Sequence, residues 1–175
     1  DRGLMFAVLL LMASGVLVSM AASPPVAERI GADTFHFIKS QLFYLTLAVP
    51  TLVTLSFFPP RLARRAGLLV FFGALALMVA ALFFGPEIKG AHRWINIGPI
   101  NLQPSEFAKP GFVIVAAWFL AEHTRRPEMP GQLVALLLAG MFIGLLIMQP
   151  DFGQKALVVL TFGSMLLIYG ISWFT

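Results

Sequence analysis

Long apolar stretches separated by short polar intervals make up most of the chain. Spanning the hydrocarbon core of a bilayer takes roughly 20 mostly apolar residues. Six stretches approach that length, at about 4–20, 42–58, 67–84, 107–120, 133–148 and 156–174. Backbone groups in lipid must satisfy their own hydrogen bonds, and these stretches are too long for barrel strands, so we expect helices. The pattern therefore predicts an all-α polytopic membrane protein with about six transmembrane helices.

The composition agrees with a membrane protein and excludes several kinds of site. The chain is 59% hydrophobic and only 11% charged, too little charge to cover a soluble domain. It has no cysteine, which excludes disulfides, thiolate metal sites and cysteine nucleophiles. Three histidines are scattered at His36, His92 and His123, without metal-ligand spacing. We therefore expect no organic cofactor and no protein metal site.

The basic residues in the short intervals predict the orientation. The intervals at 59–66 and 122–131 hold three and two arginines and lie on one side if six helices alternate. Basic and acidic residues nearly balance on the other side. Because cytoplasmic loops carry an excess of Lys and Arg, the arginine-rich side and the amino terminus are predicted to be cytoplasmic. Outer loops are then expected at about 21–38 and 85–105, with a tight outer turn at 149–154.

One interval, residues 89–111, is neither plainly apolar nor a short linker. We expect Gly85-Pro86 to end the preceding helix, Gly98-Pro99 to turn the chain, and Ser105 to cap the following helix. The interval carries most of the polar side chains near the predicted spans, namely His92, Arg93, Asn96, Asn101, Gln103, Ser105, Glu106 and Lys109, with Trp94 among them. Its place between two membrane-length segments makes it the first place to look for chemistry.

Glu106 and Lys109 lie three residues apart, so on a helix they share one face. Both side chains are costly in lipid and should face the protein interior or an aqueous cavity. They either form a structural ion pair or line a cavity for an anionic, sugar-bearing substrate, in which Arg93 and Lys109 contact phosphate. Pro110 predicts a distorted or late-starting helix.

A second polar cluster lies at residues 148–155, where two helices must meet in a tight turn. Pro150 and Gly153 supply the turn, and Asp151 either caps the next helix or completes a polar site with the residues above. Trp94 is first interpreted as an interfacial anchor, with sugar stacking as the alternative, and His92 as a solvated loop residue. Five glycines in the helices are interpreted as close-packing positions: Gly15, Gly73, Gly140, Gly144 and Gly163.

The two polar clusters resemble the two signatures of the SEDS family (shape, elongation, division and sporulation). The first is Gly90-Ala91-His92-Arg93-Trp94, followed by Gly98-Pro99 and by Leu102-Gln103-Pro104-Ser105-Glu106-Phe107-Ala108-Lys109; the second is Gln149-Pro150-Asp151-Phe152-Gly153. Their order and placement between spans match, and the resemblance covers essentially the whole chain. Lys109-Pro110, Ala117-Trp118 and Phe152-Gly153-Gln154 are more similar to the cell-division members than to the elongation members.

The resemblance implies a multi-pass peptidoglycan glycosyltransferase of the bacterial inner membrane, at the division septum. It would polymerise lipid II, the undecaprenyl-pyrophosphate disaccharide-pentapeptide, with a class B penicillin-binding protein and other divisome membrane proteins as partners and no nucleic acid. By motif match, the substrate cavity would include Arg93, Gln103, Ser105, Glu106, Lys109 and Asp151, with Trp94 as a sugar or interface contact. The chemistry would allow a divalent cation at the pyrophosphate.

The resemblance also places the catalytic group elsewhere. Family members have about ten spans, with a catalytic carboxylate in a large outer loop between the seventh and eighth. This chain begins without methionine and stops directly after its sixth apolar stretch, so we expect the amino-terminal part of a longer protein. No catalytic residue is then expected within it, and the piece alone is expected to be inactive. Intramembrane charges also mark transport paths, so a lipid II transporter (flippase) stays an alternative, as do an elongation-type polymerase and a structural role in recruiting a synthase.

Overall fold

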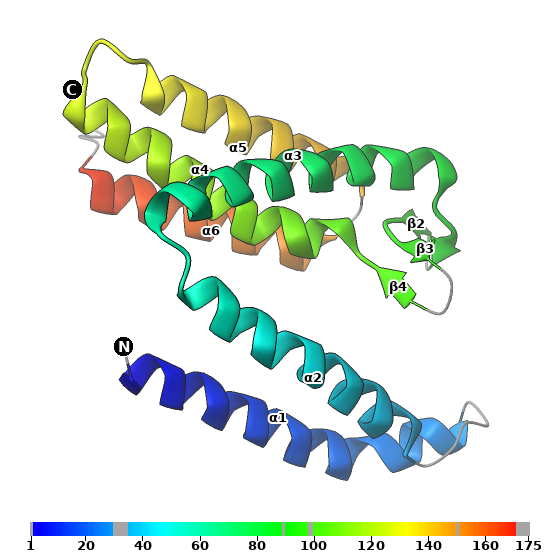
Figure 1. Ribbon diagram of the computed structural model, residues 1–175. Coiled ribbons are helices and arrows are strands. Elements are labelled where there is room, and N and C mark those ends of the chain that lie inside the picture. Colours follow the sequence, from blue (N-terminus) through cyan, green and yellow to red (C-terminus); the bar gives the residue numbers. More distant parts are fainter. Residues whose placement is uncertain (1, 30–34, 89, 98–99, 150, 171–175) are drawn as a thin grey trace. The chain divides into compact units, whose positions relative to one another are not determined.

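Helices make up most of the part of the chain that the computed structural model describes, which is residues 2–29, 35–88, 90–97, 100–149 and 151–170 (Figure 1). In chain order they are α1 (Arg2–Arg29), α2 (His36–Ser56), α3 (Pro60–Phe84), α4 (Pro104–Arg125), α5 (Gly131–Met148) and α6 (Phe152–Tyr169). The all-α prediction is confirmed. The chain divides into two compact units, residues 1–58 and 59–175, which are described separately below.

The first unit is a pair of helices, α1 packed against α2. Both leave large apolar side chains such as Leu11, Leu17 and Phe43 exposed, as expected of helices that meet lipid. The predicted loop at 21–38 is too long. The helix α1 continues to Arg29 with Pro24 and Pro25 inside it, and α2 begins at His36.

The second unit packs α3, α5 and α6 around α4. Each helix contributes one phenylalanine to a shared aromatic centre, with Phe112 of α4 in the middle. Its ring centroid lies 5.8 Å from that of Phe71 in α3, 5.6 Å from Phe142 in α5 and 5.6 Å from Phe162 in α6. Phe71, Phe112 and Phe142 are almost completely buried. Such ring pairs add about 0.5–1.5 kcal/mol each beyond the area they bury, so they fix the helices around α4.

Glycine allows the close approach of α3 and α4. A Cβ atom built at Gly111 would lie 2.8 Å from the backbone nitrogen of Phe71 and 3.0 Å from the carbonyl oxygen of Gly67. One built at Gly67 would lie 2.8 Å from the side chain of Ile114. The close-packing positions interpreted from the sequence were different. At Gly73, Gly140, Gly144 and Gly163 an added Cβ meets nothing within 4 Å among the described atoms, so the described helices do not pack closely at these four positions.

Five of the described helices, all but α4, are long and apolar enough to cross a membrane. The stretch predicted as the fourth span, about 107–120, forms the helix α4 but carries Glu106, Lys109 and Glu122 near its ends, which lowers its mean hydropathy. It is nevertheless the helix around which the second unit is packed. The other helices overlap their predicted spans, each starts before its apolar run, and α1 ends well beyond its own. The predicted end of the last span, 171–174, lies outside the described residues.

Two small β-hairpins connect α3 to α4, in a segment for which the sequence predicted only an interfacial loop. The first pairs β1 (Glu87–Ile88) with β2 (Ala91–His92), and the second pairs β3 (Ile95–Ile97) with β4 (Ile100–Leu102), both antiparallel. Gly90 lies in the first turn with φ +75°, a left-handed conformation that favours glycine. The predicted turn at Gly98-Pro99 lies outside the described residues. The helix α3 ends at Phe84, directly before Gly85-Pro86, as predicted.

Candidate functional site

An ion pair joins the two polar clusters that are separated in the sequence. Arg93 lies between β2 and β3, and Asp151 lies directly before α6. The guanidinium Nη1 of Arg93 donates to Oδ2 of Asp151 at 2.8 Å, and each side chain is 21% exposed. The fold therefore brings together two predicted cavity residues that are 58 positions apart.

Asp151 fulfils both roles that the sequence left open. Its Oδ1 accepts a hydrogen bond from the backbone N–H of Gln154 at 3.2 Å, which caps the amino terminus of α6. Its Oδ2 is the partner of Arg93. One carboxylate therefore fixes the start of a helix and holds a cation at the same time.

A second ion pair lies in the first turns of α4. Lys109 Nζ lies 2.7 Å from Oε2 of Glu106, three residues earlier, which confirms that the two share a helix face. Lys109 is the better buried partner, at 19% exposed against 48% for Glu106. The helix runs without interruption from Pro104 through Pro110 to Arg125, so the late start predicted from Pro110 is wrong.

Gln154 links the two ion pairs. Its backbone N–H donates to the capping carboxylate of Asp151, and its side-chain Nε2 donates to Oε1 of Glu106 at 2.6 Å. We call the five connected residues, Arg93, Asp151, Gln154, Glu106 and Lys109, the charged network. Gln154 was not among the predicted cavity residues, although the spacing Asp151-x-x-Gln154 is the capping-box pattern that marks such a helix start.

The charged network is electrically balanced, with two basic and two acidic side chains. Two of its buried polar atoms, Nε of Arg93 and Oε1 of Gln154, have no hydrogen-bond partner within the described part of the chain. An arginine carries five N–H donors and a lysine three, so both cations keep donors that the carboxylates do not use. The network can therefore accept further polar groups without first breaking an ion pair.

The predicted residues Gln103 and Ser105 lie at the start of α4 but bond to each other. Gln103 Nε2 donates to Oγ of Ser105 at 3.1 Å, and Ser105 is 1% exposed. The predicted helix cap at Ser105 is wrong, because α4 begins at Pro104 and Ser105 is already in its first turn. A proline suits the first helical position, since its missing N–H would have no partner there.

Trp94 and His92 of this region are both partly shielded from solvent. Trp94 is half-buried between β2 and β3. His92 is also half-buried, and its Nδ1 lies 2.7 Å from the carbonyl oxygen of Gly85. His92 is thus not a solvated loop residue, as the sequence suggested, but attaches the first hairpin to the end of α3.

Gln149 is a polar residue that sequence reasoning also missed as part of the site. Its side chain is 1% exposed, and its Nε2 donates to the carbonyl oxygen of Met78 in α3 at 3.1 Å. It directly follows α5 and lies two residues before Asp151. A fully buried amide bonded to a neighbouring helix fixes where α5 ends, and hence where Asp151 begins α6.

We expect Gln149→Leu to lower the unfolding free energy by about 1 kcal/mol, because one buried hydrogen bond is lost while the Met78 carbonyl keeps its helical partner. Thermal unfolding in detergent measures this change. Gln132→Leu, at a half-buried position near the start of α5, serves as the control and should change stability by less than about 0.5 kcal/mol. Equal effects of the two substitutions would contradict the role assigned to Gln149.

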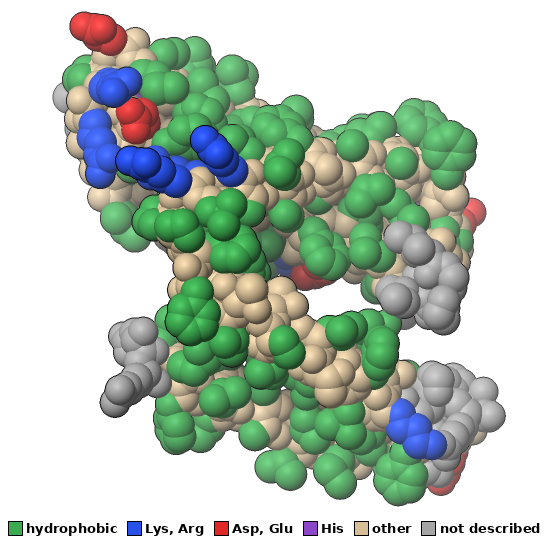
Figure 2. Space-filling view, viewed as in Figure 1, with side chains coloured by type: hydrophobic (Ala, Val, Ile, Leu, Met, Phe, Trp, Pro, Cys, Tyr) green, Lys and Arg blue, Asp and Glu red, His purple; other side chains and the backbone are tan. Residues whose placement is uncertain are grey.

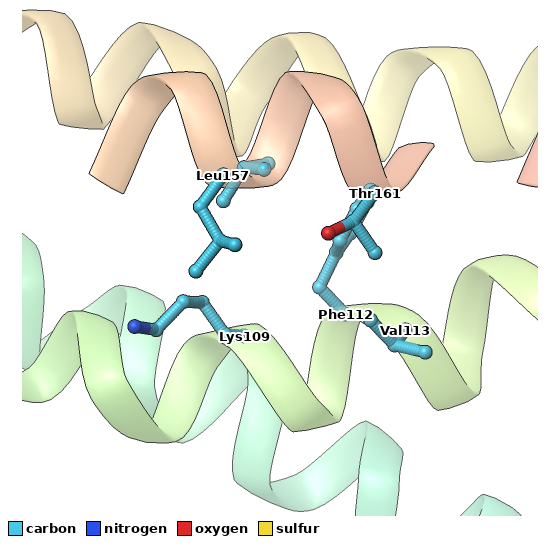
Figure 3. A pocket seen from close by; sticks show the side chains of 6 residues that line it. Lys109, Phe112, Val113, Leu157 and Thr161 are labelled. Atoms are coloured by element: carbon cyan, nitrogen blue, oxygen red, sulfur yellow. The ribbon is translucent and has the colours of Figure 1, made fainter. Parts of the chain in front are cut away.

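A mainly apolar groove of about 90 Å³ begins beside Lys109 (Figure 3). Phe112 and Val113 of α4 form one side, and Leu157 and Thr161 of α6 the other. The aliphatic stem of Lys109 lies against the groove, and Figure 3 shows its nitrogen at the groove's end. The groove therefore places an apolar surface directly beside Lys109 of the charged network.

The described residues do not fit a metal ion. Among them no group of three or more His, Asp or Glu side chains is arranged to hold one. Glu106 and Asp151 are each engaged by a basic side chain, whereas a divalent cation needs several free oxygen ligands.

Comparison with known proteins places these motifs in a family. Residues 2–175 match the family described as cell cycle protein, which comprises FtsW, RodA and SpoVE, and the chain belongs to it. A relative from Caulobacter vibrioides, named probable peptidoglycan glycosyltransferase FtsW, is 40% identical over 99% of this chain and 45% of its own length. A relative with the same name from Halorhodospira halophila is 34% identical over 91% of this chain and 41% of its own length.

Solved structures share the fold as well. One is a chain of a peptidoglycan synthase complex that is described as coordinating polymerization and crosslinking. It superposes on this chain with a TM-score of 0.78 at 28% identity, and the match covers 99% of this chain and 48% of the other. The rod shape determining protein RodA of Thermus thermophilus gives a TM-score of 0.77 at 28% identity, covering 99% and 55%. This chain thus spans about half the length of the proteins it matches.

Proposed function

We propose that the full-length protein is a peptidoglycan glycosyltransferase that polymerises lipid II into glycan strands during cell division. The relatives named FtsW, at up to 40% identity, support the activity and the division role over the elongation role of RodA. The similarity to a synthase complex supports a class B penicillin-binding protein as partner. The arginine-rich intervals support a place in the inner membrane with the amino terminus in the cytoplasm.

The charged network is the observation that carries this proposal. Glycosyl transfer from a lipid pyrophosphate needs a base for the acceptor hydroxyl and positive charge on the leaving pyrophosphate. Arg93 and Lys109 keep N–H groups for that pyrophosphate, while Asp151 and Glu106 hold the two cations in position. The base itself is expected outside this chain, so the network binds and orients the substrate.

We place the part of the substrate's lipid chain nearest the pyrophosphate in the apolar groove beside Lys109. A polyprenyl chain is apolar along its whole length and ends at the pyrophosphate. In our proposal the polyprenyl chain runs along α4 and α6 past Phe112 and Leu157. Its phosphate end then lies at Lys109. No metal ion is assigned to the network, because its carboxylates are already paired.

Purified full-length protein, with its partner synthase, is expected to convert lipid II into glycan strands that electrophoresis resolves by length. Movement of labelled lipid II across vesicle membranes is measured in parallel. Polymerisation that is lost when residues of the charged network are substituted supports the proposed glycosyltransferase activity. Lipid movement without polymerisation under any partner condition would support the transporter and overturn the proposal.

We expect Lys109→Gln to lower polymerisation about tenfold to a hundredfold, because one donor to the leaving group is lost. Lys155→Gln is the matched control. Lys155 lies near the network in the sequence, but its Nζ lies over the Phe152 ring, 4.2 Å from the centroid. The control should keep activity within about threefold, since a cation–π contact with the largely exposed Phe152 ring contributes little. Equal losses in the two variants would argue against a specific role for Lys109.

Depletion of the protein in cells is expected to block septum formation and give filaments, because we propose a division role from the FtsW-like residues. Microscopy after depletion measures this. Loss of rod shape with normal septation would instead indicate the elongation role.

A further inference from the structure

A second groove lies at the opposite end of α4 from the charged network. It has a volume of about 380 Å³ and runs between the start of α3 and the last turns of α4. Small side chains at Ala63, Ala117 and Ala121 leave room for it. Arg64 near the start of α3 and Arg125, the last residue of α4, lie at its end, and Trp118 and Glu122 also line it.

The end of the groove is strongly basic. Figure 2 shows Lys and Arg side chains gathered in a row over this end of the second unit. The intervals at 59–66 and 122–131 hold five arginines against two glutamates: Arg61, Arg64, Arg65, Arg125 and Arg126 against Glu122 and Glu128. Only Arg126 has an acidic partner among the residues that the structure describes, with its Nε 3.5 Å from Glu122. Most of this positive charge is therefore unbalanced.

Arg64 is held in place without being neutralised. Its Nε donates to the carbonyl oxygen of Pro60 at 3.2 Å, and its Cζ lies 5.8 Å from the centroid of the Trp118 ring. Both partners leave the terminal nitrogens of the guanidinium available. An arginine positioned in this way can form bidentate hydrogen bonds with a phosphate.

We propose that this groove binds one anionic phospholipid. Its phosphate contacts Arg64 and Arg125, and one acyl chain lies along Ala117 and Ala121 toward the middle of the membrane. Three observations select this occupant: the lining is apolar apart from Arg64, Glu122 and Arg125, α3 is long and apolar enough to span the membrane, and arginines outnumber the one carboxylate of the lining. Glu122 is itself paired with Arg126, which leaves Arg64 and Arg125 for the phosphate. Basic pockets between transmembrane helices on the cytoplasmic side bind such headgroups, and a tryptophan is typical of the interface depth. The site is independent of the proposed glycosyltransferase activity.

Native mass spectrometry of the full-length protein, equilibrated with phosphatidylglycerol or phosphatidylcholine in detergent, tests the proposal. One retained phosphatidylglycerol is expected, bound roughly tenfold more tightly than phosphatidylcholine. Arg64→Gln with Arg125→Gln should remove that preference. Arg61→Gln with Arg65→Gln removes the same charge from the same end without altering a lining residue, and should change the affinity less than about threefold.

A second variant tests the apolar part of the site. Ala117→Leu with Ala121→Leu fills the floor and leaves all five arginines in place, so it should also release the lipid. Thermal unfolding of each variant shows that the fold is retained. Equal affinity for the two phospholipids, equal effects of the two arginine pairs, or competition by inorganic phosphate alone would each overturn the proposal.

Discussion

Replacing Asp151 with alanine is expected to lower lipid II polymerisation by the full-length protein at least a hundredfold, equivalent to about 2.7 kcal/mol of transition-state stabilisation. The substitution frees Arg93, which is held at 2.8 Å, and removes the cap of α6 in one step. Through Gln154 it also disturbs the link to Glu106. The initial rate of glycan synthesis at saturating lipid II measures the effect.

The same substitution should lower the unfolding free energy by about 2–3 kcal/mol, from a lost cap and a partly buried cation left without its partner. Asp151→Asn keeps an oxygen that can cap α6, so it should lower the unfolding free energy less than Asp151→Ala does. Its polymerisation rate should fall nearly as far as that of Asp151→Ala. Glu122→Ala is the control. It also removes the acidic half of an ion pair, but its partner Arg126 is largely exposed. It should change both measurements little. A wild-type rate for Asp151→Ala would exclude the network from the reaction.

Replacing Gly111 with leucine is expected to prevent α3 and α4 from packing and to cost about 4 kcal/mol or more of stability. A first side-chain carbon at Gly111 would already lie 2.8 Å from backbone of α3, and backbone cannot move aside without separating the helices. The aromatic centre around Phe112, one residue later, would be displaced with it. The yield of folded protein and its thermal unfolding midpoint measure the loss.

Gly140→Leu is the matched control for that experiment. Gly140 is also a glycine inside a helix, but a Cβ atom added there would meet nothing within 4 Å among the described atoms. Leucine favours helix over glycine by about 0.5–1 kcal/mol, so this variant should be as stable as the parent or slightly more. If Gly140→Leu proved as damaging as Gly111→Leu, the helix contacts described above would be wrong.

Much of the helical architecture could be predicted from hydrophobic length, because a membrane-spanning helix needs little besides a sufficient apolar run. The ends were harder to predict. Pro24 and Pro25 break helices in water, yet α1 continues through them to Arg29. Ser105 is a good capping residue by type, but Pro104 already occupies the first helical position. The helix-packing glycines could not be identified from spacing, since close approach depends on which face meets a neighbour.

The charged residues of the candidate site could be identified from the sequence because acidic and basic side chains are rare near membrane-length segments. Their connection could not be predicted. Gln154 and Gln149 are uncharged, and their importance depends on partners far away in the chain, Glu106 and the Met78 carbonyl. The roles proposed for the cavity residues in substrate binding stay predictions until activity is measured.

The most direct test of the central claim, that the two ion pairs act as one site, is a double-mutant cycle in the polymerisation assay. The rates of Asp151→Asn, Glu106→Gln and the double variant are compared with the parent. If Gln154 couples the pairs, the double variant should be little slower than the slower single variant, a coupling of at least about 1 kcal/mol. Losses that simply multiply would show two independent ion pairs and contradict the account.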